Sequence, residues 1–131
     1  MTPQQVQLIR NSFALVEKQE HEFVDRFYDR LFEIAPDARS LFPSDLHAQK
    51  TKLFAALKLV VHSLERFDQL RPALRDMGQR HRGYGVVFED YGLVGEALVQ
   101  TLGEVLGDAA DTATEDAWFM AYTTISDAMN A

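Results

Sequence analysis

Histidine is the side chain in this sequence best suited to hold a metal or cofactor, and it occurs at positions 21, 47, 62 and 81. His81 differs from the others because it ends a short predicted helix just before the turn Gly83-Tyr84-Gly85. Apolar residues surround it in the sequence (Leu74, Met77 and Val86). An imidazole placed there could project into an apolar cavity, with the Met77 carbonyl one helical turn earlier as acceptor for its second nitrogen. Haem iron is commonly held by one such histidine, although an ordinary exposed histidine would give the same spacing.

A second set of polar groups could face a ligand bound on the opposite side of such a cofactor. Tyr28 lies beside Phe27 in an aromatic stretch, and Gln49 and Leu53 are four residues apart, so they share a helix face. A tyrosine hydroxyl and a glutamine amide can both donate a hydrogen bond to a bound ligand. The same spacing also suits a half-buried core tyrosine and a solvent-facing glutamine.

Helical periodicity predicts the elements that position these residues, and no sustained alternation predicts a strand. Thr2-Pro3 is typical of a helix start, Ala35-Pro36 should break the second helix, and Gly107 should end the fifth. The predicted helices start at Pro3, follow Gln19, and cover 39–42, about 46–64, about 73–80, about 90–106 and the stretch from Thr114 onward, with corners at 43–45 and 68–72. The sequence therefore predicts an all-α domain of six or seven helices.

Composition narrows the function classes. The 131 residues predict a single domain, 1–131, with 47% hydrophobic residues to fill one core. A net charge of −7 argues against nucleic acid and against an anionic membrane surface. The absence of cysteine excludes disulfides, iron–sulfur clusters and thioether-linked haem. No apolar stretch is long enough to span a membrane and the first ten residues lack a secretory signal, so we expect a cytoplasmic protein.

Five stretches in register carry a resemblance to a known family. The sequence resembles the globins, and among them the bacterial single-domain globins related to flavohaemoglobins; it is also similar to neuroglobin. The stretches are FYDRLFEIAPDARSLF (27–42), QKTKLFAALKLVV (49–61), GQRHRGYGV (78–86), YGLVGEALVQTLGEVLG (91–107) and DAWFMAY (116–122). The resemblance implies a three-over-three helical sandwich with crossings of ~50° around a non-covalent haem b.

The resemblance also assigns roles to individual residues. It implies that His81 is the proximal iron ligand, that Tyr28 and Gln49 are the ligand-side donors, and that Leu53 is the apolar gate above the iron. Phe42 matches the phenylalanine that wedges against the porphyrin. Further cofactor contacts are expected from Lys52, Met77, Tyr84, Val86 and Tyr91, with Arg80 and Arg82 as additional partners for the propionates. His47 should face away from the iron, because it lies about 200° around the helix from Gln49.

The activity implied is reversible binding of O2, NO and CO. Two donors toward bound O2 predict high affinity and slow release, which suits capture or reaction of O2 better than bulk oxygen transport. NO dioxygenation, a form of nitric oxide detoxification, would need an external reductase, since we expect no attached reductase domain. Tyr91 matches the tyrosine that bacterial relatives pair with a glutamate, but no glutamate follows Glu115, which argues against peroxidase-like chemistry.

Two other classes stay open at this point: a haem-based redox or gas sensor that acts through a protein partner, and a haem-free regulator with the same helices. The placement of His81 argues against the second. The sequence assigns no oligomeric state.

Overall fold

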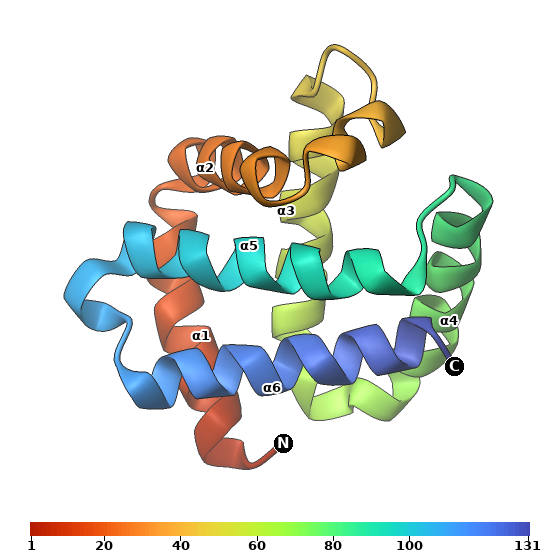
Figure 1. Cartoon of the computed structure of the whole chain (residues 1–131). Helices are drawn as coiled ribbons and strands as arrows, with labels where there is room; N and C mark the ends of the chain where they lie inside the picture. Colours follow the sequence, from red (N-terminus) through yellow and green to blue (C-terminus); the bar gives the residue numbers. More distant parts are fainter.

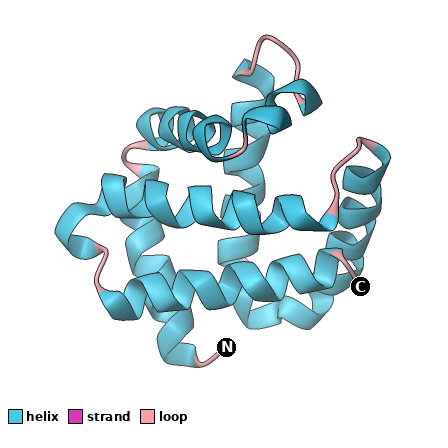
Figure 2. Cartoon of the chain, in the orientation of Figure 1, coloured by secondary structure: helices cyan, strands magenta, loops and turns pink.

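Six α-helices and three short 3₁₀ helices make up the chain in the computed structural model, which describes residues 1–131. Figure 2 shows helices and loops and no strand. The prediction of an all-α protein is confirmed. In chain order the elements are α1 (Pro3–Glu17), α2 (Glu20–Ile34), η1 (Pro36–Leu41), α3 (His47–His62), η2 (Leu64–Arg66), α4 (Phe67–Gly83), α5 (Phe88–Leu106), η3 (Gly107–Ala109) and α6 (Thr112–Met129).

Several helix ends follow from local chemistry that the sequence displays. The Thr2 hydroxyl accepts a hydrogen bond from the Gln5 N–H at 3.1 Å, and the Gln5 side chain accepts one from the Thr2 N–H at 2.9 Å. This reciprocal capping satisfies two N–H groups that the first turn of α1 leaves unpaired. Gly107 ends α5 with a φ of 57°, a conformation that glycine adopts without steric cost.

The fourth helix differs from its prediction. The sequence indicated a corner over residues 68–72, whereas α4 begins at Phe67 and runs through Pro72. Pro72 lies inside α4, where its missing N–H removes one hydrogen bond of the helix. Arg71 stabilises this first part of α4: its guanidinium lies 4.7 Å from the centre of the Phe67 ring and donates to the Asp68 carboxylate at 3.0 Å. The predicted corner is therefore wrong.

The helices form two crossing layers. In Figure 1, α2, α5 and α6 run across the view, and α1, α3 and α4 cross them. The most extensive packing between helices is that of α2 on α5, and both α1 and α4 pack on α6. The three-over-three arrangement is thereby confirmed. No helix of the structure is both long and apolar enough to cross a membrane.

Buried side chains fall into two clusters of unequal size. The larger, which we call the main core, joins α1, α2, α3, α5 and α6 around Phe13, whose ring stacks on Phe54 at 5.4 Å and lies 6.3 Å from Trp118. The smaller, which we call the small core, consists of Leu74, Tyr91, Ala128 and Met129. It holds α4 against α5 and α6.

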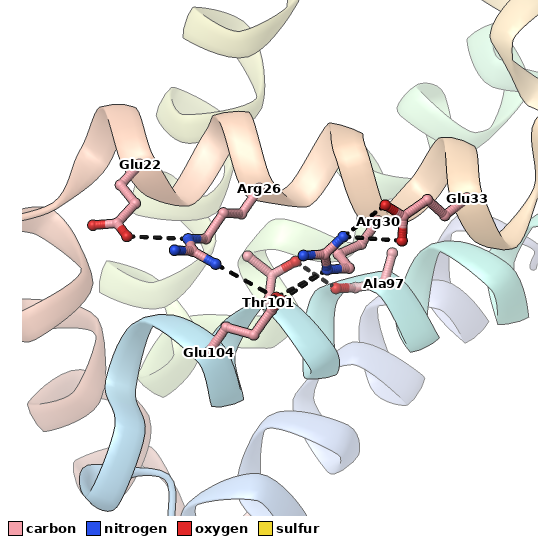
Figure 3. Close-up of polar contacts among 7 residues, drawn as sticks. All are labelled: Glu22, Arg26, Arg30, Glu33, Ala97, Thr101 and Glu104. Carbon is pink, nitrogen blue, oxygen red and sulfur yellow. Dashed lines mark hydrogen bonds and ion pairs between the residues drawn. The ribbon is translucent and has the colours of Figure 1, made fainter.

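Ion pairs fasten α2 to α5 on the outside of the main core (Figure 3). The Arg30 guanidinium bridges both oxygens of Glu104 on α5, at 2.8 and 3.0 Å, and also contacts Glu33 on its own helix. Arg26 adds a second link to Glu104 at 3.8 Å. These contacts fix the rotation of α2, the helix that carries Tyr28.

Candidate functional site

His81 occupies the last turn of α4, and its ring is half-buried. Its Nδ1 lies 2.7 Å from the Met77 carbonyl oxygen, the acceptor that the sequence indicated. A carbonyl oxygen can only accept, so Nδ1 carries the hydrogen, and in the neutral imidazole Nε2 keeps its lone pair. The arrangement gives the chain one oriented imidazole nitrogen that is able to coordinate a metal.

A close helix crossing sets the position of α4. A β carbon built on Gly78 would lie 1.8 Å from the carbonyl oxygen of Met129, so only glycine permits this approach of α4 to α6. One turn away, Leu74 packs with Met129 in the small core. Arg82 adds a hydrogen bond to the same Met129 carbonyl at 3.3 Å. The C-terminal half of α4, and with it His81, is therefore positioned by the end of α6.

Tyr28, on α2, lies in an aromatic cluster with three phenylalanines. Its ring is 5.1 Å from Phe27, 5.9 Å from Phe32 and 5.7 Å from Phe42, and the residue is 3% exposed. Burial raises the pKa of the Tyr28 hydroxyl above its ordinary value of 10.0, and the neighbouring Gln49 side chain partly offsets the rise. The hydroxyl is thus a proton-bearing donor at neutral pH, and it stands beside a glutamine amide.

The third helix presents two different faces. Phe54 and Val61 are buried in the main core, whereas Gln49, Leu53 and Leu57, spaced four residues apart, are half-buried. His47 is exposed and lines a separate polar pocket of about 270 Å³ with His21 and other residues of α2 and α3. This is consistent with the expectation that His47 faces away from the Gln49 side of the helix.

The structure sorts the remaining predicted cofactor contacts by exposure. Phe42, Met77 and Val86 are half-buried, and Tyr91 is buried. Lys52 is exposed and Tyr84 is 70% exposed, as suits groups at the rim of a pocket rather than inside it. Of the two further arginines, Arg80 is exposed, and Arg82 uses one nitrogen to bind Met129.

The donor set fits a haem better than a metal ion held by protein ligands alone. No group of three or more His, Cys, Asp or Glu side chains could hold a metal ion. Haem brings nitrogen ligands of its own, so its iron requires from the protein little more than the free Nε2 of His81. The Tyr91 hydroxyl, on the small-core side, is buried without a hydrogen-bond partner and is available to a bound group. Burial raises its pKa, and the nearby Arg82 guanidinium partly offsets that rise.

Two residues near the site carried no separate signal in the sequence. Leu41, at the end of η1, approaches the α4–α5 turn: its side chain would be 3.4 Å from a β carbon on Gly85, where φ is 98°. Arg39 binds backbone carbonyls of the segment that follows η1. Neither contact has a sequence signature, because one depends on a turn approaching a distant helix and the other on main-chain acceptors.

Comparison with known proteins gives concordant matches. The Globin family model matches residues 25–129. The flavohemoprotein of Bacillus subtilis is 31% identical over 126 residues, which cover 94% of this chain and 32% of that protein. The flavohemoprotein of Rhizobium meliloti is 28% identical over 131 residues, covering 97% of this chain and 32% of that protein. The chain thus spans about a third of the length of these curated relatives.

Two solved structures are also similar to this chain. An engineered carbene transferase from Rhodothermus marinus, described as a candidate nitric oxide dioxygenase, superposes with a TM-score of 0.85 at 32% identity, covering 97% of this chain and 89% of that one. A bacterial globin from Campylobacter jejuni gives a TM-score of 0.84 at 24% identity, covering 98% and 96% of the two chains. The second similarity establishes the fold alone.

Proposed function

The chain belongs to the globin family, and from this premise we propose that it holds a non-covalent haem b through His81 and reversibly binds O2, NO and CO. The observation that carries the proposal is the 2.7 Å contact between His81 Nδ1 and the Met77 carbonyl, which leaves Nε2 free. Leu53, Phe42, Met77, Val86 and Tyr91 would enclose the porphyrin, and Lys52 and Tyr84 would lie at its edge. The haem, when bound, supplies an iron that takes up diatomic gases.

Tyr28 and Gln49 would control ligand release. Their hydroxyl and amide groups would donate hydrogen bonds to a bound ligand that carries partial negative charge, and a preorganised donor stabilises such charge without reorganisation. A hydrogen bond to a charged acceptor contributes about 1.5–3 kcal/mol, and each ~1.4 kcal/mol slows release about tenfold. The raised pKa of Tyr28 favours this role, because the hydroxyl keeps its proton at neutral pH. We therefore propose high O2 affinity with slow release.

NO dioxygenation is the finer activity that we propose for this pocket. The net reaction combines NO, O2 and one electron to give nitrate, so each turnover requires an external reductant. Supporting observations are the similarity to flavohemoproteins and to the Rhodothermus marinus protein. In this activity Tyr28 and Gln49 would retain O2 until NO arrives, and His81 would hold the iron.

Absorption spectra of ferric, ferrous and O2-exposed protein test the proposal. We expect a haem band and a stable O2 complex in the unaltered chain, and loss of the band in His81→Ala. His62→Ala is the matched control, because His62 is exposed at the end of α3. A protein that takes up no added haem, or a His81→Ala variant with an unchanged spectrum, would refute the proposed site.

Tyr28→Phe tests the ligand-side donor separately. The loss of one hydrogen bond should speed O2 release at least about tenfold, measured by stopped-flow displacement with CO. Equal release rates in Tyr28→Phe and the unaltered chain would remove Tyr28 from the proposed function and leave haem binding intact.

A further inference from the structure

Arg39 lies in the middle of η1 and holds the segment that connects η1 to α3. One terminal nitrogen donates to the carbonyl oxygens of Phe42 and Pro43, at 3.3 and 2.9 Å, and the other donates to that of Ser44 at 3.0 Å. No backbone N–H outside the regular helices donates to these three carbonyls. A single guanidinium therefore fixes three successive peptide units immediately after η1.

The same guanidinium also covers the aromatic cluster around Tyr28. Its carbon atom lies 5.2 Å from the centre of the Phe32 ring, and Phe32 is 5.7 Å from Phe42. Tyr28 contacts both rings, at 5.9 and 5.7 Å. Arg39 thus touches this cluster twice, through the face of Phe32 and through the backbone of Phe42.

We propose that Arg39 is a positioning residue for the ligand side of the pocket: by holding Phe42 and Phe32 it fixes the ring of Tyr28, and so governs ligand release without touching the ligand. This inference rests on the proposed function. Hydrogen bonds weaken steeply with distance and angle, so a small rotation of the Tyr28 ring reduces the bond that its hydroxyl can donate. Catalytic and binding donors are effective only when neighbouring groups lock their side chains.

Arginine is the residue type that this double role requires. Its guanidinium is flat, so it can lie over an aromatic ring while its edge presents several N–H groups in fixed directions. Lysine keeps the charge but concentrates it on one small ammonium group that cannot do both. Arg39→Lys therefore tests the geometry of the side chain, and Arg39→Met, which keeps a long apolar stem, tests the hydrogen bonds and the charge together.

The experiment uses the full chain loaded with haem. O2 dissociation is measured by stopped-flow, and the Fe–CO stretching frequency of the CO complex reports the donor next to the ligand. We expect O2 release to accelerate about threefold to tenfold in Arg39→Lys, and further in Arg39→Met toward the rate of Tyr28→Phe. In the double variant Arg39→Met/Tyr28→Phe, release should be no faster than in Tyr28→Phe alone, because the two residues act through one hydroxyl.

Arg71→Lys is the matched control. Arg71 also lies over a phenylalanine ring, that of Phe67 at 4.7 Å, but its hydrogen bond goes to the Asp68 carboxylate and it holds no loop carbonyl. The rate of O2 release and the Fe–CO stretching frequency should therefore stay unchanged in this variant. Acceleration of the same size in Arg71→Lys would mean that any loss of an arginine on an aromatic ring has this effect, and would overturn the proposal.

Two other results would overturn the inference while leaving the proposed function intact. One is release and a CO frequency like those of the unaltered chain in both Arg39 variants, while Tyr28→Phe is accelerated. The other is additive acceleration in the double variant, which would show that Arg39 does not act through Tyr28. If Arg39→Met fails to fold, Arg39→Lys decides between these outcomes. An unaltered chain that binds no haem would instead refute the proposed function.

Discussion

The main core and the small core differ greatly in size, and the proposed function assigns them to the two sides of the haem. The main core joins α1, α2, α3, α5 and α6 through large aromatic side chains such as Phe13, Phe23 and Trp118, and ion pairs close it from the outside. The small core holds α4 with Leu74, Tyr91, Ala128 and Met129. Of the residues in α4 itself, only Leu74 and Gly78 are buried.

The proposed function therefore places stability and ligation in separate parts of the fold. The proposed ligand-side donor Tyr28 lies in the main core, whereas His81 is carried by a helix in which only Leu74 and Gly78 are buried. A segment with few buried apolar contacts opens at low free energy. We therefore expect α4 to be the element whose order depends most on a bound haem, because binding to the folded state stabilises it by mass action.

The largest expected effect is at the centre of the main core. Phe13 is 1% exposed, and Phe13→Ala should lower the free energy of unfolding by about 3–5 kcal/mol through lost burial and a cavity. Phe119→Ala, at a residue 64% exposed, should change it by no more than about 0.5 kcal/mol. Chemical denaturation followed by circular dichroism measures both. Similar values for the two variants would contradict the assignment of stability to the main core.

A substitution at the α4–α6 crossing should separate ligation from folding. Gly78→Ala brings a β carbon against the Met129 carbonyl, so α4 must shift, at a cost of about 1–3 kcal/mol. The displaced His81 should weaken haem affinity at least about tenfold while the helical content is retained. Gly83→Ala is the control on the same helix, because nothing lies within 4 Å of its β carbon. Equal haem affinities in the two variants would show that the crossing does not position His81.

Hydrogen exchange compares the two regions without a substitution. In the haem-free chain, amides of α4 should exchange faster than those of α5, which buries residues along its whole length. Added haem should slow exchange in α4 more than in α5. Uniform protection of both helices before haem is added would remove the proposed difference in local stability.

The smallest effect is expected from the buried tyrosines, one in each region. Burial raises the pKa of Tyr28 in the main core and of Tyr91 in the small core, both above the ordinary 10.0. The folded chain then holds protons that the unfolded chain releases, so stability is complete below pH 10 and falls as the pH rises above it. Tyr28→Phe and Tyr91→Phe should each lower the number of protons released on unfolding by up to one. The slope of the unfolding free energy against pH measures this number. An unchanged slope in either variant would show that its tyrosine titrates alike in both states.

Local chemistry explains why much of the fold could be predicted. The helix starts at Thr2-Pro3 and after Gln19, the break at Ala35-Pro36 and the stop at Gly107 each depend on residues within one turn of the chain. The corner predicted over 68–72 is wrong, because contacts within the first turns of α4 support a helix there. Proline commonly marks a helix boundary, whereas Pro72 lies inside α4, where it removes one hydrogen bond and the Arg71–Phe67 contact supports the helix.

In the candidate site too, contacts within one helix were predictable and contacts between helices were not. The hydrogen bond from His81 to the Met77 carbonyl was predictable, because both residues lie on one helix four positions apart. The pairing of Tyr28 with Gln49 requires two helices, so the residue types named both groups as possible donors but did not place them side by side. The roles of the individual pocket residues remain predictions that the proposed variants test.

The sequence by itself determined the start of α1, the end of α2, the end of α5, the orientation of His81 within its own turn and the exclusion of cysteine-based chemistry, because these depend on residue type and short-range spacing. Only the tertiary structure decided that Gly78 must be a glycine, that α4 has little support of its own and that Arg39 binds the segment after η1. The physical reason is that each of these depends on atoms brought together from distant parts of the chain or on main-chain carbonyls. A carbonyl group is the same in every residue, so its position carries no signature in the sequence.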